Sequence, residues 1–262
     1  MNELIKKVMK KREFSRLPER DVMLAFGKFD NGKYGDEEKV KLTRELLHKV
    51  FGAFASQKLL SPKSKDVEWI LRKHLSTRER LPYYEKVYDR LLKGFEKVSI
   101  IDLGAGINGF SYNYFEKDVN YIGVEAIGQL VDLMNDYFVK EKIEGKAVHL
   151  SLFELEKIKK LIKEVKGNKI VFLFKTVDCL EMLKKDYSKK LVSGIVDLVN
   201  TQGGHENLSR GRVVVSFATK SMGKGTRFRA NRNWFFDFVK KDFKVLDDFE
   251  IGGERYLVFS KK

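Results

Sequence analysis

The stretch Val98-Ser-Ile-Ile-Asp-Leu-Gly-Ala-Gly-Ile-Asn-Gly109 decides the fold. Its apolar start predicts a buried strand that Asp102 closes, and Gly104 and Gly106 then let the backbone turn tightly beside a ligand. We expect a helix to begin shortly after Gly109, so that its N-terminal N–H groups and its dipole face the bound molecule. The segment therefore predicts the start of a nucleotide-binding α/β domain.

Two cofactors fit this turn. Gly104-x-Gly106-x-x-Gly109 matches the dinucleotide pattern, and Asp102-x-Gly104-x-Gly106 matches the pattern of S-adenosyl-L-methionine sites, with Ala105 between the glycines. Glu125 follows Gly106 by 19 residues and ends the next apolar run, where a carboxylate can accept hydrogen bonds from ribose hydroxyls. A glycine-rich turn that binds no cofactor is the remaining alternative.

The order of elements after residue 97 separates the two cofactors. Strand and helix patterns alternate, which predicts a doubly wound parallel sheet, and Gly252-Gly253 joins the last two strands as a hairpin, so that one of them runs antiparallel. This arrangement favours an α/β, Rossmann-like class I methyltransferase domain over 94–262 with S-adenosyl-L-methionine as cofactor. We expect strands at 98–103, 120–125, 146–150, 169–175, 212–218, 244–250 and 255–260, and helices at 109–117, 127–140, 153–166, 178–199 and 231–241.

Composition limits the class of partner. The 262 residues carry 52 Lys and Arg against 37 Asp and Glu, a net charge of +15, which favours a polyanionic partner. No apolar run is long enough to cross a membrane, and the first residues do not resemble a signal peptide. A single cysteine, Cys179, offers neither a disulfide nor a metal cluster. We therefore expect a cytoplasmic monomer that binds no metal.

The first 93 residues predict a basic helical extension, because no strand pattern precedes Val98. Arg12, Arg16 and Arg20 would share one helix face if that segment were helical throughout, although Pro18 favours a break, and a solvated surface is the alternative to an RNA contact. Further along, Ser76-Thr77-Arg78-Glu79 has the spacing of a capping box, which places Arg78 and Arg80 on a fixed turn just ahead of the first strand.

Either Arg78 or Arg80 could bind a carboxylate through two hydrogen bonds, or could be an ordinary surface residue.

Two later segments also carry candidate chemistry. Lys175 ends an apolar strand at the edge where ligands bind in such sheets, so it could contact an acceptor base or a phosphate, or simply reach solvent. The segment that follows the fifth strand has no acidic residue between Glu206 and Asp237, and it interleaves basic with aromatic side chains, as an RNA-binding loop does. Its candidate RNA contacts are Lys220, Lys224, Arg227, Phe228, Arg229, Arg232 and Trp234.

Taken in order, these motifs resemble those of the Arm/Rmt-type 16S rRNA (guanine-N7) methyltransferases of aminoglycoside resistance. The resemblance covers most of the chain. The segments that carry it are Leu47-His48-x3-Gly52-Ala53-Phe54, His74-x-Ser76-Thr77-Arg78-Glu79-Arg80-Leu81, Ile101-Asp102-Leu103-Gly104-Ala105-Gly106-Ile107-Asn108, Phe172-Leu173-Phe174-Lys175 with Leu180-Glu181, and Val215-Ser216-Phe217-x-Thr219-Lys220-Ser221-Met222-Gly223.

The resemblance implies roles for particular residues. Arg80 would hold the carboxylate of S-adenosyl-L-methionine, with Arg78 as second choice, and the extension and basic loop would grip the small ribosomal subunit. Ser151 and Leu152 stand where relatives contact the adenine, although relatives often have Asp at the place of Ser151, and Ala105 replaces a usual Cys.

The function predicted is methylation of N7 of a guanine in 16S rRNA, guanine 1405 by resemblance, with Lys175 orienting the base. Guanine N7 carries an in-plane lone pair, so it needs alignment and not a general base. Two alternatives remain: an RNA-binding protein that keeps the methyltransferase scaffold without catalysis, and a methyltransferase acting on a small molecule.

Overall fold

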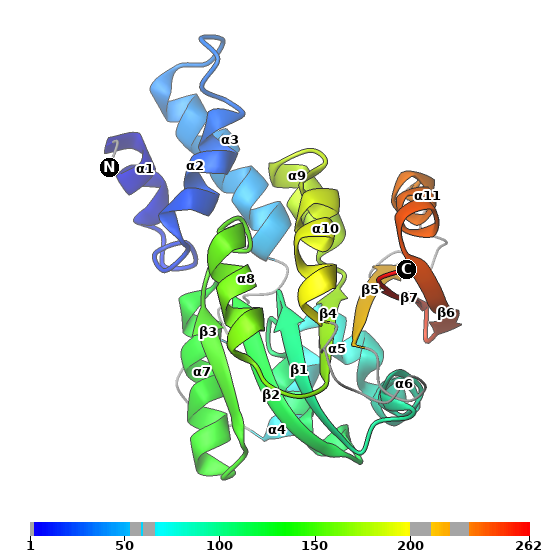
Figure 1. The fold of residues 1–262 in the computed structure, drawn as a ribbon. Helices are drawn as coiled ribbons and strands as arrows, with labels where there is room; N and C mark the ends of the chain where they lie inside the picture. The colour runs from blue at the N-terminus through cyan, green and yellow to red at the C-terminus, as the bar shows by residue number, and fades with distance from the viewer. Residues whose placement is uncertain (1–2, 53–58, 60–65, 200–210, 221–230) are drawn as a thin grey trace.

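The seven strands found among the described residues form one sheet (Figure 1). The structure is a computed structural model that describes residues 3–52, 59, 66–199, 211–220 and 231–262. The strand order is β3-β2-β1-β4-β5-β7-β6, with β7 antiparallel to both of its neighbours and the pairs among β1 to β5 parallel. The predicted class I methyltransferase fold with its antiparallel hairpin is therefore confirmed. The strands are β1 (Lys97–Leu103), β2 (Asp118–Glu125), β3 (Gly145–His149), β4 (Lys169–Phe174), β5 (Arg212–Ala218), β6 (Lys244–Ile251) and β7 (Glu254–Ser260).

The central strands are mostly apolar because both of their faces are covered. All six residues of β4 are buried, as are the inner residues of β1 and β5. Asp102 pairs in register with Phe172 of β4, and Leu103 with Val124 of β2. Because β1, β2 and β4 run parallel, their carboxyl ends meet at one edge of the sheet, at the point where the strand order reverses.

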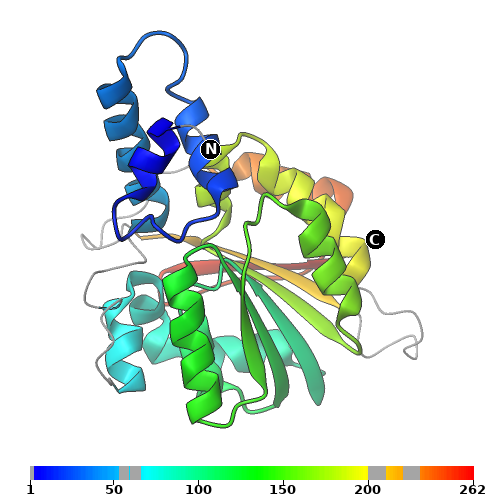
Figure 2. The same ribbon diagram turned by 90° about the vertical axis from the view of Figure 1, so that its left-hand side faces the viewer.

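Helices cover both faces of the sheet (Figure 2). One group lies beside α7, and the other beside α10, which packs on α8, β4 and β5. None of the described helices is long and apolar enough to cross a membrane. The first group is α4 (Val67–Lys73), α5 (Leu75–Arg80), α6 (Tyr84–Leu92) and α7 (Gly128–Lys140), and the second is α8 (Leu155–Glu164), α9 (Val177–Leu183), α10 (Tyr187–Val199) and α11 (Asn233–Asp242).

The N-terminal extension is helical, as predicted. Its helices α1 (Glu3–Met9), α2 (Glu19–Gly27) and α3 (Asp36–Leu47) pack on one another and lie together at one end of the sheet (Figures 1 and 2). The π-helix η1 (His48–Gly52) follows α3 directly. Buried residues of this extension belong to the same hydrophobic cluster as the sheet.

Three local predictions are wrong. The helix predicted at 109–117 is a 3-10 helix, η3 (Asn108–Tyr114), which ends three residues earlier than expected. The predicted helix 178–199 is two helices, because Asp186 has a φ of 58° and the Glu181 carboxylate accepts hydrogen bonds from the N–H groups of Asp186 and Ser188. The cap of α5 is His74, whose Nδ1 accepts from the Thr77 N–H, and not Ser76.

Candidate active site

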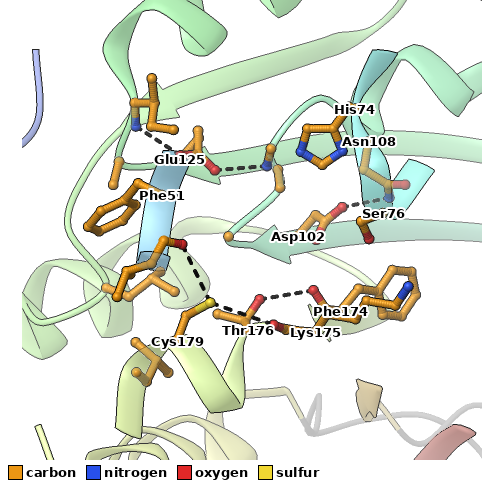
Figure 3. A pocket seen from close by; sticks show the side chains of 18 of the residues that line it. Phe51, His74, Ser76, Asp102, Asn108, Glu125, Phe174, Lys175, Thr176 and Cys179 are labelled. Atoms are coloured by element: carbon orange, nitrogen blue, oxygen red, sulfur yellow. Dashed lines mark hydrogen bonds between the residues drawn. The ribbon is translucent and has the colours of Figure 1, made fainter. Parts of the chain in front are cut away.

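A pocket opens at the carboxyl ends of β1, β2 and β4, with an empty volume of about 780 Å³ that includes its opening to solvent. Figure 3 shows Asp102 and Glu125 at the ends of two neighbouring strands, with Phe174, Lys175 and Thr176 from the third. The extension also lines the pocket, through Asp21, Val50, Phe51, His74, Ser76, Thr77 and Arg80.

The glycine-rich turn is held tightly by its surroundings. Gly104 and Gly106 have φ values of 80° and 57°, and the Gly104 and Ala105 N–H groups both donate to the Val124 carbonyl. A Cβ on Gly104 would lie 2.8 Å from the Thr176 hydroxyl, and a Cβ on Gly106 would lie 2.8 Å from the His74 ring. The glycines therefore permit close packing of protein side chains as well as approach of a ligand.

Asp102 is fixed at the pocket floor with one oxygen unsatisfied. Its Oδ2 accepts from the Asn108 amide at 2.8 Å and from the Tyr121 hydroxyl at 2.7 Å. Its Oδ1 is buried and has no hydrogen-bond partner among the described residues. Burial raises the pKa of Asp102, and the two donors oppose that shift. An unsatisfied buried acceptor in a pocket is suited to a ligand that donates a hydrogen bond.

Glu125 ends β2 and supports the turn. Its Oε2 accepts from the Gly106 N–H and its Oε1 from the Ile127 N–H, both at 2.8 Å (Figure 3). Burial raises the pKa of Glu125, while these backbone donors act in the opposite direction. Each carboxylate oxygen has a second lone pair, so Glu125 can also accept from a ligand hydroxyl.

The structure distinguishes the two candidate arginines. Arg80 is buried and lines the pocket, whereas Arg78 is exposed and lies outside it. The Arg80 guanidinium donates to Glu254, Asn108, Ser76 and Tyr256 at distances from 2.8 to 3.3 Å. Four of its five N–H groups are thus used within the protein. A bond to a ligand carboxylate can use the fifth, while the expected two-bond grip requires one of these partners to be released.

Lys175 lies at the end of β4, beside the pocket. Its ammonium donates to Glu79 at 2.7 Å and lies 3.2 Å from Glu254 Oε2. Its side chain is 9% exposed and its φ is 56°, a backbone conformation that costs a residue with a side chain about 1 kcal/mol or more. Glu79 accepts one of the three ammonium protons, so the ammonium keeps donors for an acceptor base.

Sequence reasoning missed Glu254, the residue that joins these two cations. It begins β7, and its carboxylate contacts both Arg80 and Lys175 and accepts from the Ser216 hydroxyl. Burial acts to raise its pKa, but the two cations hold the pKa of Glu254 below its ordinary value. Glu254 lies 174 residues from Arg80 in the sequence, and no local pattern marks a pair so distant.

Of the two residues predicted to contact the adenine, only one lines the pocket. Leu152 lines it, but Ser151 does not. The Ser151 hydroxyl instead donates to Asp21 of α2 and accepts from the Phe153 N–H. Asp21, which sequence reasoning also missed, does line the pocket. The serine therefore positions another side chain, and its predicted contact with the cofactor is corrected.

The predicted face of Arg12, Arg16 and Arg20 does not exist, because α1 ends at Met9 and α2 begins at Glu19. All three arginines are exposed. Arg16 forms an ion pair with Asp132 of α7, and its carbonyl accepts from the Gly128 N–H. Arg16 therefore attaches the extension to the methyltransferase domain, while Arg12 and Arg20 are exposed side chains on the extension.

The basic segment after β5 is described only at its ends. Lys220 is exposed. Arg232 is buried, forms an ion pair with Asp178 at 2.6 Å and donates to the Ala218 carbonyl, so its role is structural and the RNA-contact prediction is corrected. Trp234 is half-buried and packs edge-on against Phe235. Lys224, Arg227, Phe228 and Arg229 lie outside the described residues.

Comparison with known proteins gives one consistent result. The chain is 22% identical over 252 residues to a 16S rRNA (guanine(1405)-N(7))-methyltransferase of Micromonospora rosea, covering 86% of this chain and 83% of that protein. It is 23% identical over 233 residues to the protein of the same name from Serratia marcescens, covering 86% and 84%.

Solved structures share the fold over the whole chain. The 16S rRNA methyltransferase RmtF, crystallised with S-adenosyl-L-homocysteine, has a TM-score of 0.74 at 18% identity, with 100% of both chains covered. The 16S rRNA methylase RmtB has a TM-score of 0.75 at 18% identity, covering 100% of this chain and 98% of that one. Residues 60–238 match the family described as ribosomal RNA methyltransferase (FmrO). The chain belongs to this ribosomal RNA methyltransferase family.

Proposed function

We propose that this enzyme transfers a methyl group from S-adenosyl-L-methionine to N7 of a guanine in 16S rRNA, and that the base is guanine 1405, as the names of its relatives indicate. The observation that carries the proposal is the donor set of the pocket. Asp102, Glu125 and Arg80 line one cavity at the strand edge where class I methyltransferases bind their cofactor.

These residues match the polar groups of the cofactor. The unsatisfied Asp102 Oδ1 suits the ammonium of the methionyl part, and the remaining Arg80 N–H suits its carboxylate. The remaining lone pairs of Glu125 suit the ribose hydroxyls. Leu152, Phe153 and Ile127 supply apolar walls for a purine. S-adenosyl-L-methionine supplies an electrophilic methyl group on a sulfonium.

Lys175 is the residue that we assign to the target base. Guanine N7 accepts the methyl group through its in-plane lone pair and loses no proton, so the protein must align the base and need not deprotonate it. An ammonium proton of Lys175 that Glu79 does not accept can donate to guanine O6, an acceptor on the same edge as N7. Glu79 and Glu254 fix the ammonium in place for this contact.

The rRNA contacts proposed are exposed cations of the extension and of the segment after β5. Arg12, Arg20 and Lys220 are exposed, and Arg227 and Arg229 continue the same basic segment in the sequence. Phosphate contacts of this kind make affinity fall steeply with salt. The excess of positive charge, +15 for the whole chain, supports a ribosomal partner.

The test is incorporation of a radiolabelled methyl group from S-adenosyl-L-methionine into purified small ribosomal subunits. We expect labelled 16S rRNA with the wild-type enzyme and none with Asp102→Ala. Binding of S-adenosyl-L-homocysteine without any labelling would favour the non-catalytic alternative. Labelling of small molecules in an extract, with none in rRNA, would favour the small-molecule alternative.

A further inference from the structure

The extension places a carboxyl group, Asp21 of α2, in the wall of the cofactor pocket. Asp21 is 1% exposed, and its Oδ1 accepts a hydrogen bond from the Ser151 hydroxyl. Among the residues that the structure describes, no lysine or arginine forms an ion pair with it. Burial of such a carboxyl is costly, and it raises the pKa of Asp21 to about 7. A cost of this kind in a ligand pocket points to a function in binding.

The neighbours of Asp21 indicate which part of the cofactor it would meet. Ser151, its hydrogen-bond partner, is followed by Leu152 and Phe153, which line the pocket together with Ile127 beyond Glu125. Glu125 is near enough for its charge to raise the pKa of Asp21. If Glu125 holds the ribose, the base attached to that ribose lies among these apolar side chains, and Asp21 is the carboxyl group in that part of the wall.

We propose that Asp21 accepts a hydrogen bond from the exocyclic amino group of the cofactor's adenine, so that the N-terminal extension completes the cofactor site and selects adenine. The inference rests on the proposed use of S-adenosyl-L-methionine. Adenine presents an N–H donor at position 6, whereas hypoxanthine presents a carbonyl acceptor there. A carboxylate accepts a hydrogen bond from the adenine amino group and repels the hypoxanthine carbonyl. A binding site that forms a hydrogen bond with one polar group discriminates strongly against an analogue that lacks this group.

The attachment of the extension explains how Asp21 is held in this position. The segment before α2 is fixed to α7 by the ion pair of Arg16 with Asp132 and by the Gln129 amide, which donates to the Arg12 carbonyl at 3.0 Å. The Gly128 N–H donates to the Arg16 carbonyl at 3.3 Å. Cofactor binding and attachment of the extension should therefore favour each other, since coupling between two sites is reciprocal.

The test compares two analogues by calorimetry: S-adenosyl-L-homocysteine and S-inosyl-L-homocysteine, in which the adenine amino group is replaced by a carbonyl. The measurement is made at about pH 8, where the Asp21 carboxyl, with a pKa of about 7, is mostly ionised. The wild type should bind the adenine analogue at least about tenfold more tightly, as expected for a buried acceptor that meets a donor and not another acceptor. Asp21→Ala should weaken binding of the adenine analogue and bring the two affinities to within about twofold.

Two further variants separate the carboxyl group from its surroundings. Glu19→Ala removes an equal charge from the same helix, at an exposed position outside the pocket, so it should keep the wild-type preference for adenine. Asp21→Asn keeps the size of the side chain and can turn its amide to donate to the inosine carbonyl, so it should bind both analogues. This variant decides the question if Asp21→Ala does not fold.

The outcomes distinguish this inference from the proposed function. If the wild type bound neither analogue, the proposed cofactor would be wrong and this inference would fail with it. If the wild type bound the adenine analogue and both Asp21 variants kept its full preference over the inosine analogue, the cofactor would stand and the role of Asp21 would be refuted.

Discussion

Asp21→Asn should make the ligand-free protein more stable at alkaline pH. The Asp21 carboxyl is raised by burial from an ordinary pKa of 3.8 to about 7. Between these two values the folded chain holds a proton that the unfolded chain releases, so the free energy of unfolding falls as the pH rises through this window. Below about pH 4 both states are protonated, and above about pH 7 the full cost of burying the charge is present.

The magnitude follows from the same two values. A difference of about 3 pH units, at about 1.4 kcal/mol for each, gives a cost of up to about 4 kcal/mol near pH 8. Asparagine cannot ionise, and its side-chain oxygen can still accept from the Ser151 hydroxyl. The variant should therefore match the wild type near pH 4 and exceed it by as much as about 4 kcal/mol near pH 8.

Urea unfolding followed by circular dichroism at several pH values measures this difference. Asp132→Asn is the matched control, because the hydrogen bond from Arg16 lowers the pKa of Asp132, so that loss of its charge should destabilise the protein at about pH 8. Wild-type and Asp21→Asn stabilities that ran parallel from about pH 4 to 8 would refute the reasoning.

Three further predictions concern the site and the rRNA contacts. Glu254→Gln should lower the free energy of unfolding by about 3–5 kcal/mol, measured by urea unfolding, because Arg80 and Lys175 lose a shared buried carboxylate; a loss below about 1 kcal/mol would contradict the account. Lys175→Ala should slow methyl transfer to small subunits while the affinity for S-adenosyl-L-homocysteine, measured by calorimetry, stays nearly unchanged. The wild-type rate should not rise between about pH 6 and 8, as it would if one side chain had to lose a proton to act as a general base. If Lys175→Ala weakened the affinity for S-adenosyl-L-homocysteine as much as it slowed methyl transfer, Lys175 would contact the cofactor and not the base. Arg227→Glu with Arg229→Glu should weaken binding of small subunits and flatten its salt dependence in filter binding, with cofactor affinity as the unchanged control.

The sequence predicted the sheet well because strand formation here depends on local apolar runs. β1, β4 and β5 are nearly continuous apolar segments, and Gly252-Gly253 marks the final hairpin, so each could be identified within a few residues. Asp102, Gly106 and Glu125 were predictable for the same reason, since their spacing reflects one strand–turn–strand unit. Arg80 could be placed near the site only because of the resemblance to a family.

The rest of the site depends on contacts between distant segments. Glu254 meets Arg80 and Lys175 only after β7 has paired with β5, and Asp21 reaches the pocket only after α2 has packed beside α9. Neither residue differs in its local sequence from a surface acid. The prediction for Arg232 failed in the opposite way. Its place in a basic segment predicted an RNA contact, but its side chain is buried in an ion pair with Asp178.

The most direct test of the proposed reaction is to locate the modified base. Small ribosomal subunits that lack the modification are incubated with the enzyme and S-adenosyl-L-methionine, and N7-methylguanine in the 16S rRNA is mapped by borohydride reduction, aniline cleavage and primer extension. The account predicts one cofactor-dependent cleavage, at guanine 1405, which is absent with Asp102→Ala. A methyl group on N1 or on an exocyclic amine, or no modified guanine in rRNA from subunits that bind the enzyme, would contradict it.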